Sequence, residues 1–408
     1  MTGGVIRLPG EFSKSAYLLI LMLISVEFFH FTPIAAYCNG DICLILFLLW
    51  MAAGHFLYNP REQYWSIKIK FYYWPVLFVW GGVLISFFAA RALYGQSFFT
   101  SFFTSRSMLA MFALPALGVV NPQVKDLEQS TLWFSVILLV FAVLDAVGIP
   151  ILDRSAYLDE KELRPYIDED SFVACLPGFH WLAMALFFYL DHLREGYTIR
   201  DLGIVLFLFA GIFLLQNRSM LFLCAIMSGY VLLTVRGGSR RQTFIIRGLV
   251  ILVAVALIGI TVPQWIKLFD ETATNLGSDD YNRILAFNYF LFQASPEPIY
   301  YFTGMGLISS NTSSIMKDLM EAGIYNSDVG FIGLWNHYGV LPIVAVLIVV
   351  VRGLKRSAPL YVKFNALFIL GSSLTLACFN TLDKLLWLCL FIYMVYQKPL
   401  LPKRETDQ

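Results

Sequence analysis

Residues 265–339 read WIKLFDETATNLGSDDYNRILAFNYFLFQASPEPIYYFTGMGLISSNTSSIMKDLMEAGIYNSDVGFIGLWNHYG. They contain the longest segment without a membrane-like apolar run, and hydrophobic stretches flank it on both sides. A connection of about sixty residues is far longer than a turn requires, and loops of that length are usually functional or disordered. Aromatic residues and glycines run through this segment, which argues against disorder. We therefore interpret the rest of the chain as a scaffold that carries this loop.

The composition is that of a polytopic membrane protein. Of the 408 residues, 58% are hydrophobic and 14% are charged, and the mean hydropathy is +0.69. Soluble domains carry about 25% charged residues. The net charge of +1 gives no indication of a nucleic-acid partner.

The apolar runs predict an all-α protein with about twelve transmembrane helices, because each run is long enough to cross about 30 Å of hydrocarbon. The predicted spans lie near 16–37, 41–58, 70–91, 102–120, 130–151, 171–191, 201–217, 218–235, 246–266, 328–351, 359–379 and 384–397. This divides the chain into three parts. Residues 1–265 hold helices one to nine, residues 266–327 form a large, partly helical loop, and residues 328–408 hold the last three helices and a tail.

The positions of Lys and Arg predict that both termini lie in the cytoplasm, since basic residues favour cytoplasmic segments. With that orientation most of the 29 basic residues fall inside, including the basic tail at 398–404. The long loop at 266–327 and the acidic loop at 153–170 then lie outside the cytoplasm.

Four charged residues fall on the outer face under this one topology. Arg106, Arg218 and Asp328 open the fourth, eighth and tenth spans, and Arg283 lies in the long loop. Ionisable residues within a membrane are costly and are functional candidates by default. Arginines grip phosphate oxygens bidentately, and a nearby carboxylate can act as a general base or orient a hydroxyl. The alternative is that the arginines anchor helix ends at the interface and that Asp328 caps its helix.

Other polar groups within the spans favour structural roles. Glu27 and His30 lie one helical turn apart and are predicted to form a hydrogen-bonded pair. Asp145 is a candidate partner for one of the arginines, while His180 and His337 are interpreted as packing or hydrogen-bonding residues. The sequence contains no HExxH, no paired CxxC and no phosphate-binding glycine loop, so we expect neither a metal site nor a nucleotide site.

Three stretches resemble the O-antigen ligase and polymerase superfamily. They are LLQNRSMLFLCAIMSGYVLL (214–233), DDYNRILAFNYFLFQASPEPIYYFTGMGL (279–307) and NSDVGFIGLWNHYGVLPIVAVLIVV (326–350). The first resembles the family span that begins with an arginine. The second resembles its arginine, apolar helix and G-x-G turn, and the third resembles its span that begins with a polar catalytic residue. The ligases usually have a histidine where this chain has Asp328, and the SDVGF start is more similar to the polymerases.

The resemblance implies a glycosyltransferase of the bacterial inner membrane whose active site faces the periplasm. Its donor would be an undecaprenyl-diphosphate-linked glycan, and the reaction would join lipid-linked repeat units into a polysaccharide. Arg218 and Arg283 would neutralise the departing diphosphate with Arg106 as a further contact, and Asp328 would accept or orient the acceptor proton. No cofactor or metal is implied, because the lipid diphosphate is itself the leaving group.

Two alternatives remain. One is an O-antigen ligase that transfers the glycan to lipid A core. The other, from a different class, is a polysaccharide flippase or transporter, since twelve spans are also a transporter architecture. Polymerases of this kind are expected to work with a chain-length regulator, which is a candidate partner.

Overall fold

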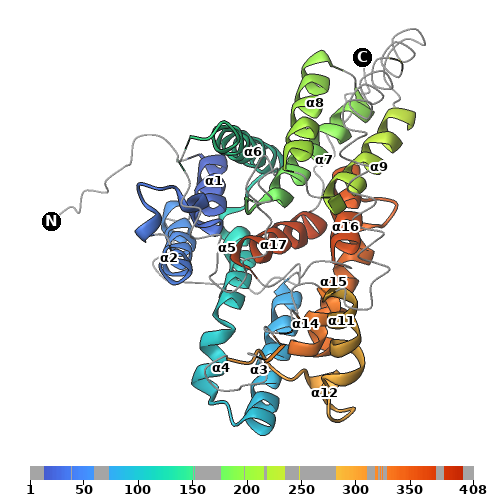
Figure 1. Cartoon of the computed structure of the whole chain (residues 1–408). Helices are drawn as coiled ribbons and strands as arrows, with labels where there is room; N and C mark the ends of the chain where they lie inside the picture. The colour runs from blue at the N-terminus through green and yellow to red at the C-terminus, as the bar shows by residue number, and fades with distance from the viewer. Residues whose placement is uncertain are drawn as a thin grey trace, which may run out of the picture.

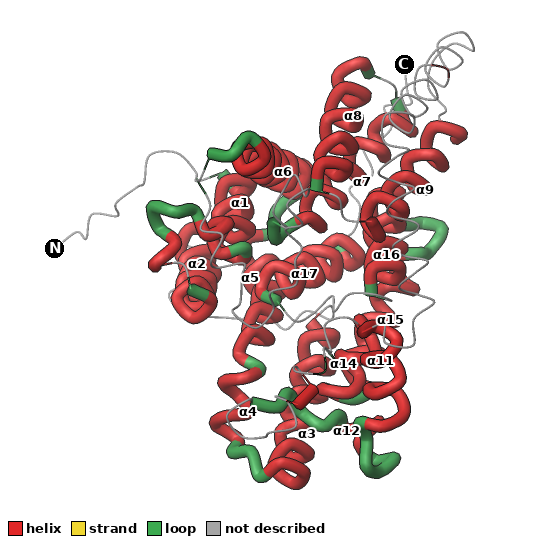
Figure 2. The backbone as a smooth tube through the Cα atoms, in the orientation of Figure 1, coloured by secondary structure: helices red, strands yellow, loops and turns green. Residues whose placement is uncertain are grey.

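The computed structural model describes residues 13–37, 39–58, 73–149, 151, 176–196, 198–215, 218–234, 248, 282–309, 318–319, 322, 324, 329–373 and 381–397. Within these ranges the elements are helices joined by loops, without β-strands (Figures 1 and 2). The predicted all-α class is therefore confirmed for the described part of the chain. The acidic loop at 153–170 and the ninth predicted span, apart from residue 248, lie outside the described residues.

The first half of the chain forms these helices: α1 (Lys14–Ser25), η1 (Glu27–His30), η2 (Ala35–Tyr37), α2 (Gly40–Tyr58), α3 (Trp74–Tyr94), α4 (Phe98–Thr104), η4 (Arg106–Phe112), α5 (Ala113–Val120), α6 (Val124–Ala146) and α7 (Phe179–Glu195). The second half forms α8 (Ile199–Leu214), α9 (Arg218–Thr234), α11 (Asn282–Asn288), η6 (Tyr289–Gln293), α12 (Tyr300–Thr303), α14 (Gly330–Tyr338), α15 (Val340–Gly353), α16 (Leu360–Ser372) and α17 (Leu382–Tyr396).

Three described helices are long and apolar enough to cross a membrane, namely α2, α3 and α6 up to Asp145. A fourth is added if the bent pair α4 and η4–α5, which turns by 64°, counts as one span. Several others, including α1, α15 and α16, are apolar but shorter. A membrane protein is supported in this coarse form, and the number twelve stays a prediction.

Three predicted spans are broken rather than continuous. The helix expected over 16–37 ends at Ser25, because Glu27, Phe28, Phe29 and His30 all have positive φ angles between 47° and 57°. Left-handed backbone cannot continue the hydrogen bonds of a right-handed helix. The span expected over 102–120 bends at Ser105, and the span over 328–351 divides at Gly339 into α14 and α15.

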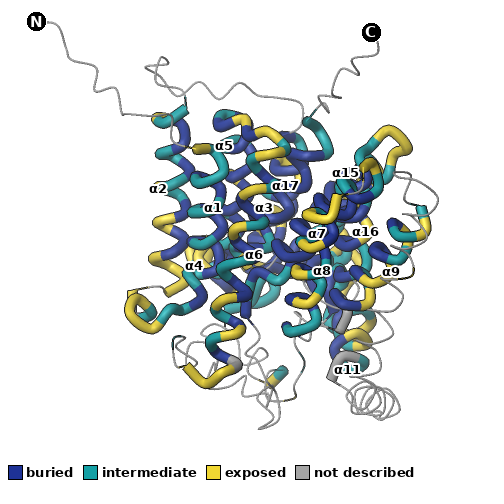
Figure 3. Tube along the Cα trace, turned by 90° about the horizontal axis from the view of Figure 1, so that it is seen from above, coloured by how far each residue is buried: buried dark blue, intermediate teal, exposed yellow. Residues whose placement is uncertain are grey.

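The core lies along α7 and α17. Residues 180–190 of α7 and 385–394 of α17 are all buried, and Figure 3 shows buried residues along the middle of the bundle. In Figure 1, α17 crosses the centre of the molecule, where it packs against α1, α5 and η4 on one side and α15 and α16 on the other. Large apolar side chains such as Leu49, Phe88 and Phe222 remain exposed on the outer helices. Apolar side chains on the outer surface of the bundle suit helices that face lipid.

The start of α1 and the end of α17 lie at the same end of the bundle. Lys14 Nζ donates to Asn121 O at 3.0 Å, and Tyr393 Oη donates to Asn121 Oδ1 at 3.0 Å. Gln397 Nε2 donates to Pro122 O at 2.9 Å. If the chain enters and leaves the membrane at the same end of the bundle, it must cross the membrane an even number of times. The predicted number of twelve spans is even. The side of the membrane on which this end lies stays a prediction.

Candidate functional site

A glycine turn in the predicted loop packs against the break between α14 and α15. Met305 N donates to Asn336 O and Gly306 N donates to His337 O, both at 2.8 Å. Gly304, Gly306 and Gly339 have φ angles of 72°, 79° and 74°, which favour glycine. A Cβ on Gly304 would lie 2.4 Å from His337 O. We call this contact between 304–306 and 336–339 the glycine lock.

His337 has the hydrogen-bonding role that its sequence position predicts. It is 6% exposed, and its Nδ1 lies 3.2 Å from Gly306 O. The imidazole of His337 therefore contacts the backbone carbonyl of Gly306, while the backbone carbonyl of His337 accepts from Gly306 N. This contact makes His337 a positioning group for the loop.

A buried glutamine ties the next residues of the loop to the α3–α4 turn. Gln96 Nε2 donates to Leu307 O at 3.0 Å, and Ser309 N donates to Gln96 Oε1 at 2.9 Å. Its Nε2 also lies 2.9 Å from Ser101 Oγ. Gln96 is fully buried, so its amide satisfies both backbone groups away from water. Sequence analysis did not single out Gln96, and its only signal is a polar residue between the predicted spans 70–91 and 102–120.

The helix that carries Arg283 packs beside the residue that follows Asp328. Ala286 and Phe290 form a small buried cluster with Val329. Arg283 occupies the first turn of α11, three residues before Ala286. Asp328 directly precedes Val329 and lies outside the described residues, and the side chain of Arg283 is not described. The segment that carries Arg283 therefore packs against Val329, the N-cap residue of α14.

Arg218 is the first residue of α9, which packs against α16, the helix that also contacts the start of α14. A Cβ on Gly371 of α16 would meet Leu223 of α9 at 2.8 Å, and Tyr230 lies near Phe364 further along, so α9 and α16 run antiparallel. Phe331 N of α14 donates to Ser373 O at 2.9 Å. The second turn of α9 and the first turn of α14 therefore meet the same end of α16. The side chain of Arg218 is not described.

Arg106 stands apart from this junction. It follows the bend between α4 and η4, and its Nε forms an ion pair with Asp41 at the start of α2. Its Nη1 donates to Phe103 O at 2.7 Å. Ser105 Oγ lies 3.4 Å from Tyr338 Oη, which connects this bend to the far end of α14. Asp41 was not singled out by sequence analysis, although it opens a predicted span on the same outer face.

A second polar pair lies beside Asp41. His30 Nε2 is 3.5 Å from Glu27 Oε2, so the predicted pair is confirmed, but in a left-handed turn instead of a helix. A Cβ on Gly40 would lie 3.2 Å from Glu27 Oε1, so Glu27 rests against the start of α2. The Glu27–His30 and Asp41–Arg106 pairs are therefore neighbours.

The remaining predicted polar groups lie in the core. His180 Nε2 is 3.8 Å from Asp383 Oδ2, and both residues are buried between α7 and α17. Asp145 is buried at the end of α6, and its pairing with an arginine stays a prediction. Within the described ranges no group of His, Cys, Asp and Glu is arranged to hold a metal ion.

Comparison with known proteins adds no assignment. No protein-family model matches this chain, and no curated protein matches it.

Proposed function

We propose that this protein is a polysaccharide polymerase that joins undecaprenyl-diphosphate-linked repeat units at the outer face of the bacterial inner membrane. Two observations support this proposal: α9, which begins at Arg218, and α14, which begins two residues after Asp328, both contact the same end of α16, and α11, which carries Arg283, packs against Val329. These residues are 65 and 45 positions apart in the sequence, so a site that combines them would have to be formed by the fold. The resemblance of the same three stretches to the O-antigen polymerases is the second support.

In the proposed reaction the acceptor hydroxyl attacks the anomeric carbon of the donor glycan. The bond between that carbon and the diphosphate oxygen breaks, with inversion at the anomeric centre. Arg218 and Arg283 neutralise the charge that develops on the departing undecaprenyl diphosphate. Asp328 accepts the proton of the acceptor hydroxyl or orients it.

We assign Arg106, at the bend between α4 and η4, a contact to the donor phosphates or sugar that is separate from the junction at the end of α16. Its Nε and Nη1 are engaged by Asp41 and Phe103, which leaves the Nη2 edge of the guanidinium for a ligand. Two broken helices flank this region, at Ser105 and at Gly339. Broken helices in membrane proteins are tolerated where they are buried in protein or line a cavity. A chain-length regulator is the proposed protein partner.

An O-antigen ligase is the nearest alternative and differs only in its acceptor, lipid A core. A transporter is the alternative of another class, and the buried His180–Asp383 pair is the observation that favours it. Ionisable pairs inside a bundle mark ion or substrate paths in many transporters.

The test is an incubation of the purified protein with its lipid-diphosphate-linked repeat unit, with chelator and without nucleotide, followed by gel analysis. We expect a product ladder from the wild type and no ladder from Arg218→Ala, Arg283→Ala or Asp328→Ala. Arg91→Ala is the matched control, because Arg91 is an arginine near the end of α3 that lies over the ring of Phe98. One addition onto lipid A core without a ladder would identify a ligase. Absence of any new glycosidic bond would direct the work to a flipping assay.

A further inference from the structure

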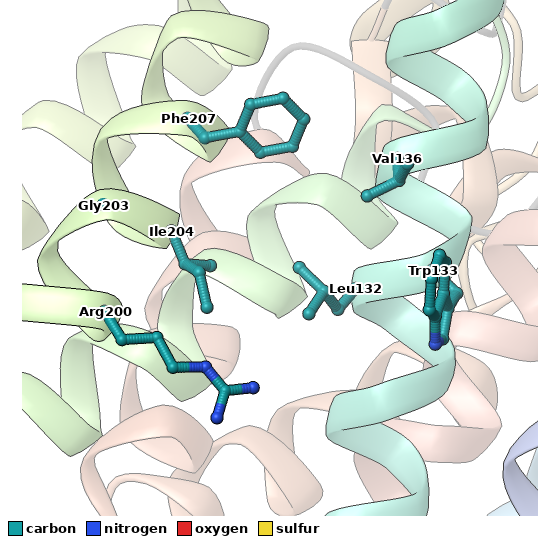
Figure 4. Close-up of a pocket in the computed structure, with 7 residues that line it drawn as sticks. All are labelled: Leu132, Trp133, Val136, Arg200, Gly203, Ile204 and Phe207. Carbon is teal, nitrogen blue, oxygen red and sulfur yellow. The ribbon is translucent and has the colours of Figure 1, made fainter.

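An apolar groove runs between α6 and α8. It has a volume of about 300 Å³ and is lined by Leu132, Trp133, Val136, Arg200, Gly203, Ile204 and Phe207 (Figure 4). Trp133 and Phe207 are 60% and 45% exposed, so their rings stand at the open edges of the groove and not in the core. α6 is one of the helices long and apolar enough to span a membrane. The groove therefore opens where acyl chains would surround the protein.

The groove is closed at one end and open at the other. A Cβ on Gly211 of α8 would meet the side chain of Leu139 of α6 at 2.5 Å, so the helices touch there. Leu132 and Ile204 line the groove seven residues earlier on each helix, which shows that α6 and α8 run parallel. At the open end, a Cβ added to Gly203 of α8 would have no heavy atom within 4 Å. The missing side chain of Gly203 leaves open space in the lining of the groove.

Arg200 is the one charged residue that lines the groove, and it lies at the open end. Figure 4 shows its guanidinium extending from α8 toward α6. The nearby acidic groups have other partners. Glu128 lies 3.6 Å from His192, and Asp201 Oδ2 accepts from Thr198 Oγ1 at 2.7 Å. No ion pair joins Arg200 to another residue in the described part of the chain.

We propose that this groove binds a phospholipid with an anionic headgroup. An acyl chain lies along Ile204, Leu132 and Val136, and the headgroup phosphate contacts the guanidinium of Arg200. Under the predicted topology this end faces the cytoplasmic leaflet, whose anionic lipids attract basic pockets between helices. The inference is independent of the polymerase proposal.

The test measures lipid binding to the delipidated protein in detergent by native mass spectrometry, with phosphatidylglycerol and phosphatidylcholine as probes. The wild type is expected to prefer phosphatidylglycerol. Arg200→Gln is expected to weaken phosphatidylglycerol binding about fivefold, the loss that one basic residue near a membrane surface implies. It is expected to weaken phosphatidylcholine binding less, because the choline group offsets the charge of the phosphate. Equal binding of both lipids by the wild type, or unchanged phosphatidylglycerol binding by Arg200→Gln, overturns the proposal.

The shape of the groove is tested separately by Gly203→Leu, which places a large side chain in the open space at Gly203. It is expected to remove the bound lipid of either headgroup. Gly229→Leu is the matched control, because Gly229 is a helical glycine on α9 that also has no atom within 4 Å of an added Cβ. If both variants retain lipid equally, the groove is not the binding site.

A third measurement uses a conservative variant that keeps an aromatic ring beside the groove. Phospholipids with brominated acyl chains are expected to quench the fluorescence of Trp133, which lines the groove. The quenched signal should fall when Trp133→Phe is compared with the wild type. Quenching that is the same in both proteins contradicts an acyl chain beside Trp133.

Discussion

At the scale of single residues, the glycine lock depends on backbone that only glycine adopts easily. Gly304 has φ 72° and ψ 168°, and the backbone carbonyl of His337 occupies the space that a Cβ would need. Gly95 also has a positive φ angle, of 64°, but no atom lies within 4 Å of its added Cβ. A comparison of substitutions at Gly304 and Gly95 therefore separates the cost of backbone strain from the cost of steric overlap.

We expect Gly304→Ala to lower the free energy of unfolding by about 3 kcal/mol, because backbone strain and overpacking each cost roughly 1–3 kcal/mol. Gly95→Ala should cost about 1 kcal/mol, the strain alone. Unfolding in mixed micelles measures both. Equal losses in the two variants would contradict a steric role for the contact with α14.

The ion pair of Asp41 and Arg106 yields a second prediction. The side chains are 63% and 41% exposed, so their pairing should stabilise the protein by at most about 1 kcal/mol. The double variant Asp41→Arg, Arg106→Asp restores the ion pair with its charges exchanged, so we expect its stability to be near that of the wild type. We expect it to lack glycan transfer, because the arginine has moved away from the bend. Thermal unfolding and the gel assay measure the two effects. Recovery of transfer in the swapped protein would leave Arg106 with a purely structural role.

At the scale of elements, the contact between α3 and α15 depends on one face of α3. A Cβ on Gly82 would lie 2.6 Å from Pro342 Cδ and 2.7 Å from Tyr338 O. A Cβ on the adjacent Gly81 would meet only Leu341, at 3.8 Å. Because these neighbours point to different sides of one helix, the same substitution should have opposite effects.

We expect Gly82→Ala to destabilise the protein by about 1–2 kcal/mol, since overpacking outweighs the better helix propensity of alanine. Gly81→Ala should be neutral or stabilise by up to about 1 kcal/mol. Denaturant titration of the two variants side by side is the measurement. A stabilising Gly82→Ala would mean that α3 and α15 are further apart than described.

The breaks within helices could not be read from hydropathy. The run at 16–37 is apolar throughout most of its length, yet α1 ends at Ser25, where four residues turn left-handed. By contrast, α8 and α9 begin and end close to the predicted spans at 201–217 and 218–235, and α17 matches the span at 384–397. Hydropathy therefore locates a helix well only when the backbone does not break within the apolar run.

At the scale of the whole molecule, the remaining question is which side of the membrane holds the loop at 266–327. We expect a fluorescent protein fused after Gln408 to fold and fluoresce in the cytoplasm. Alkaline phosphatase inserted between residues 314 and 315 should be active, because that enzyme requires the oxidising periplasm. The same insertion at 354–355 is the control and should be inactive. The reverse pattern would invert the topology and place the candidate arginines in the cytoplasm.

The sequence by itself determined the membrane class, the position of many helices and the pairing of Glu27 with His30, because hydropathy and helical spacing are local properties. It also identified three stretches whose elements lie together in the fold. Only the tertiary structure decided that Gly304 fits against His337, that Arg106 pairs with Asp41 and that Gln96 holds Leu307. Each of these contacts joins residues at least 33 positions apart, and its existence depends on how helices approach one another, which no local pattern encodes.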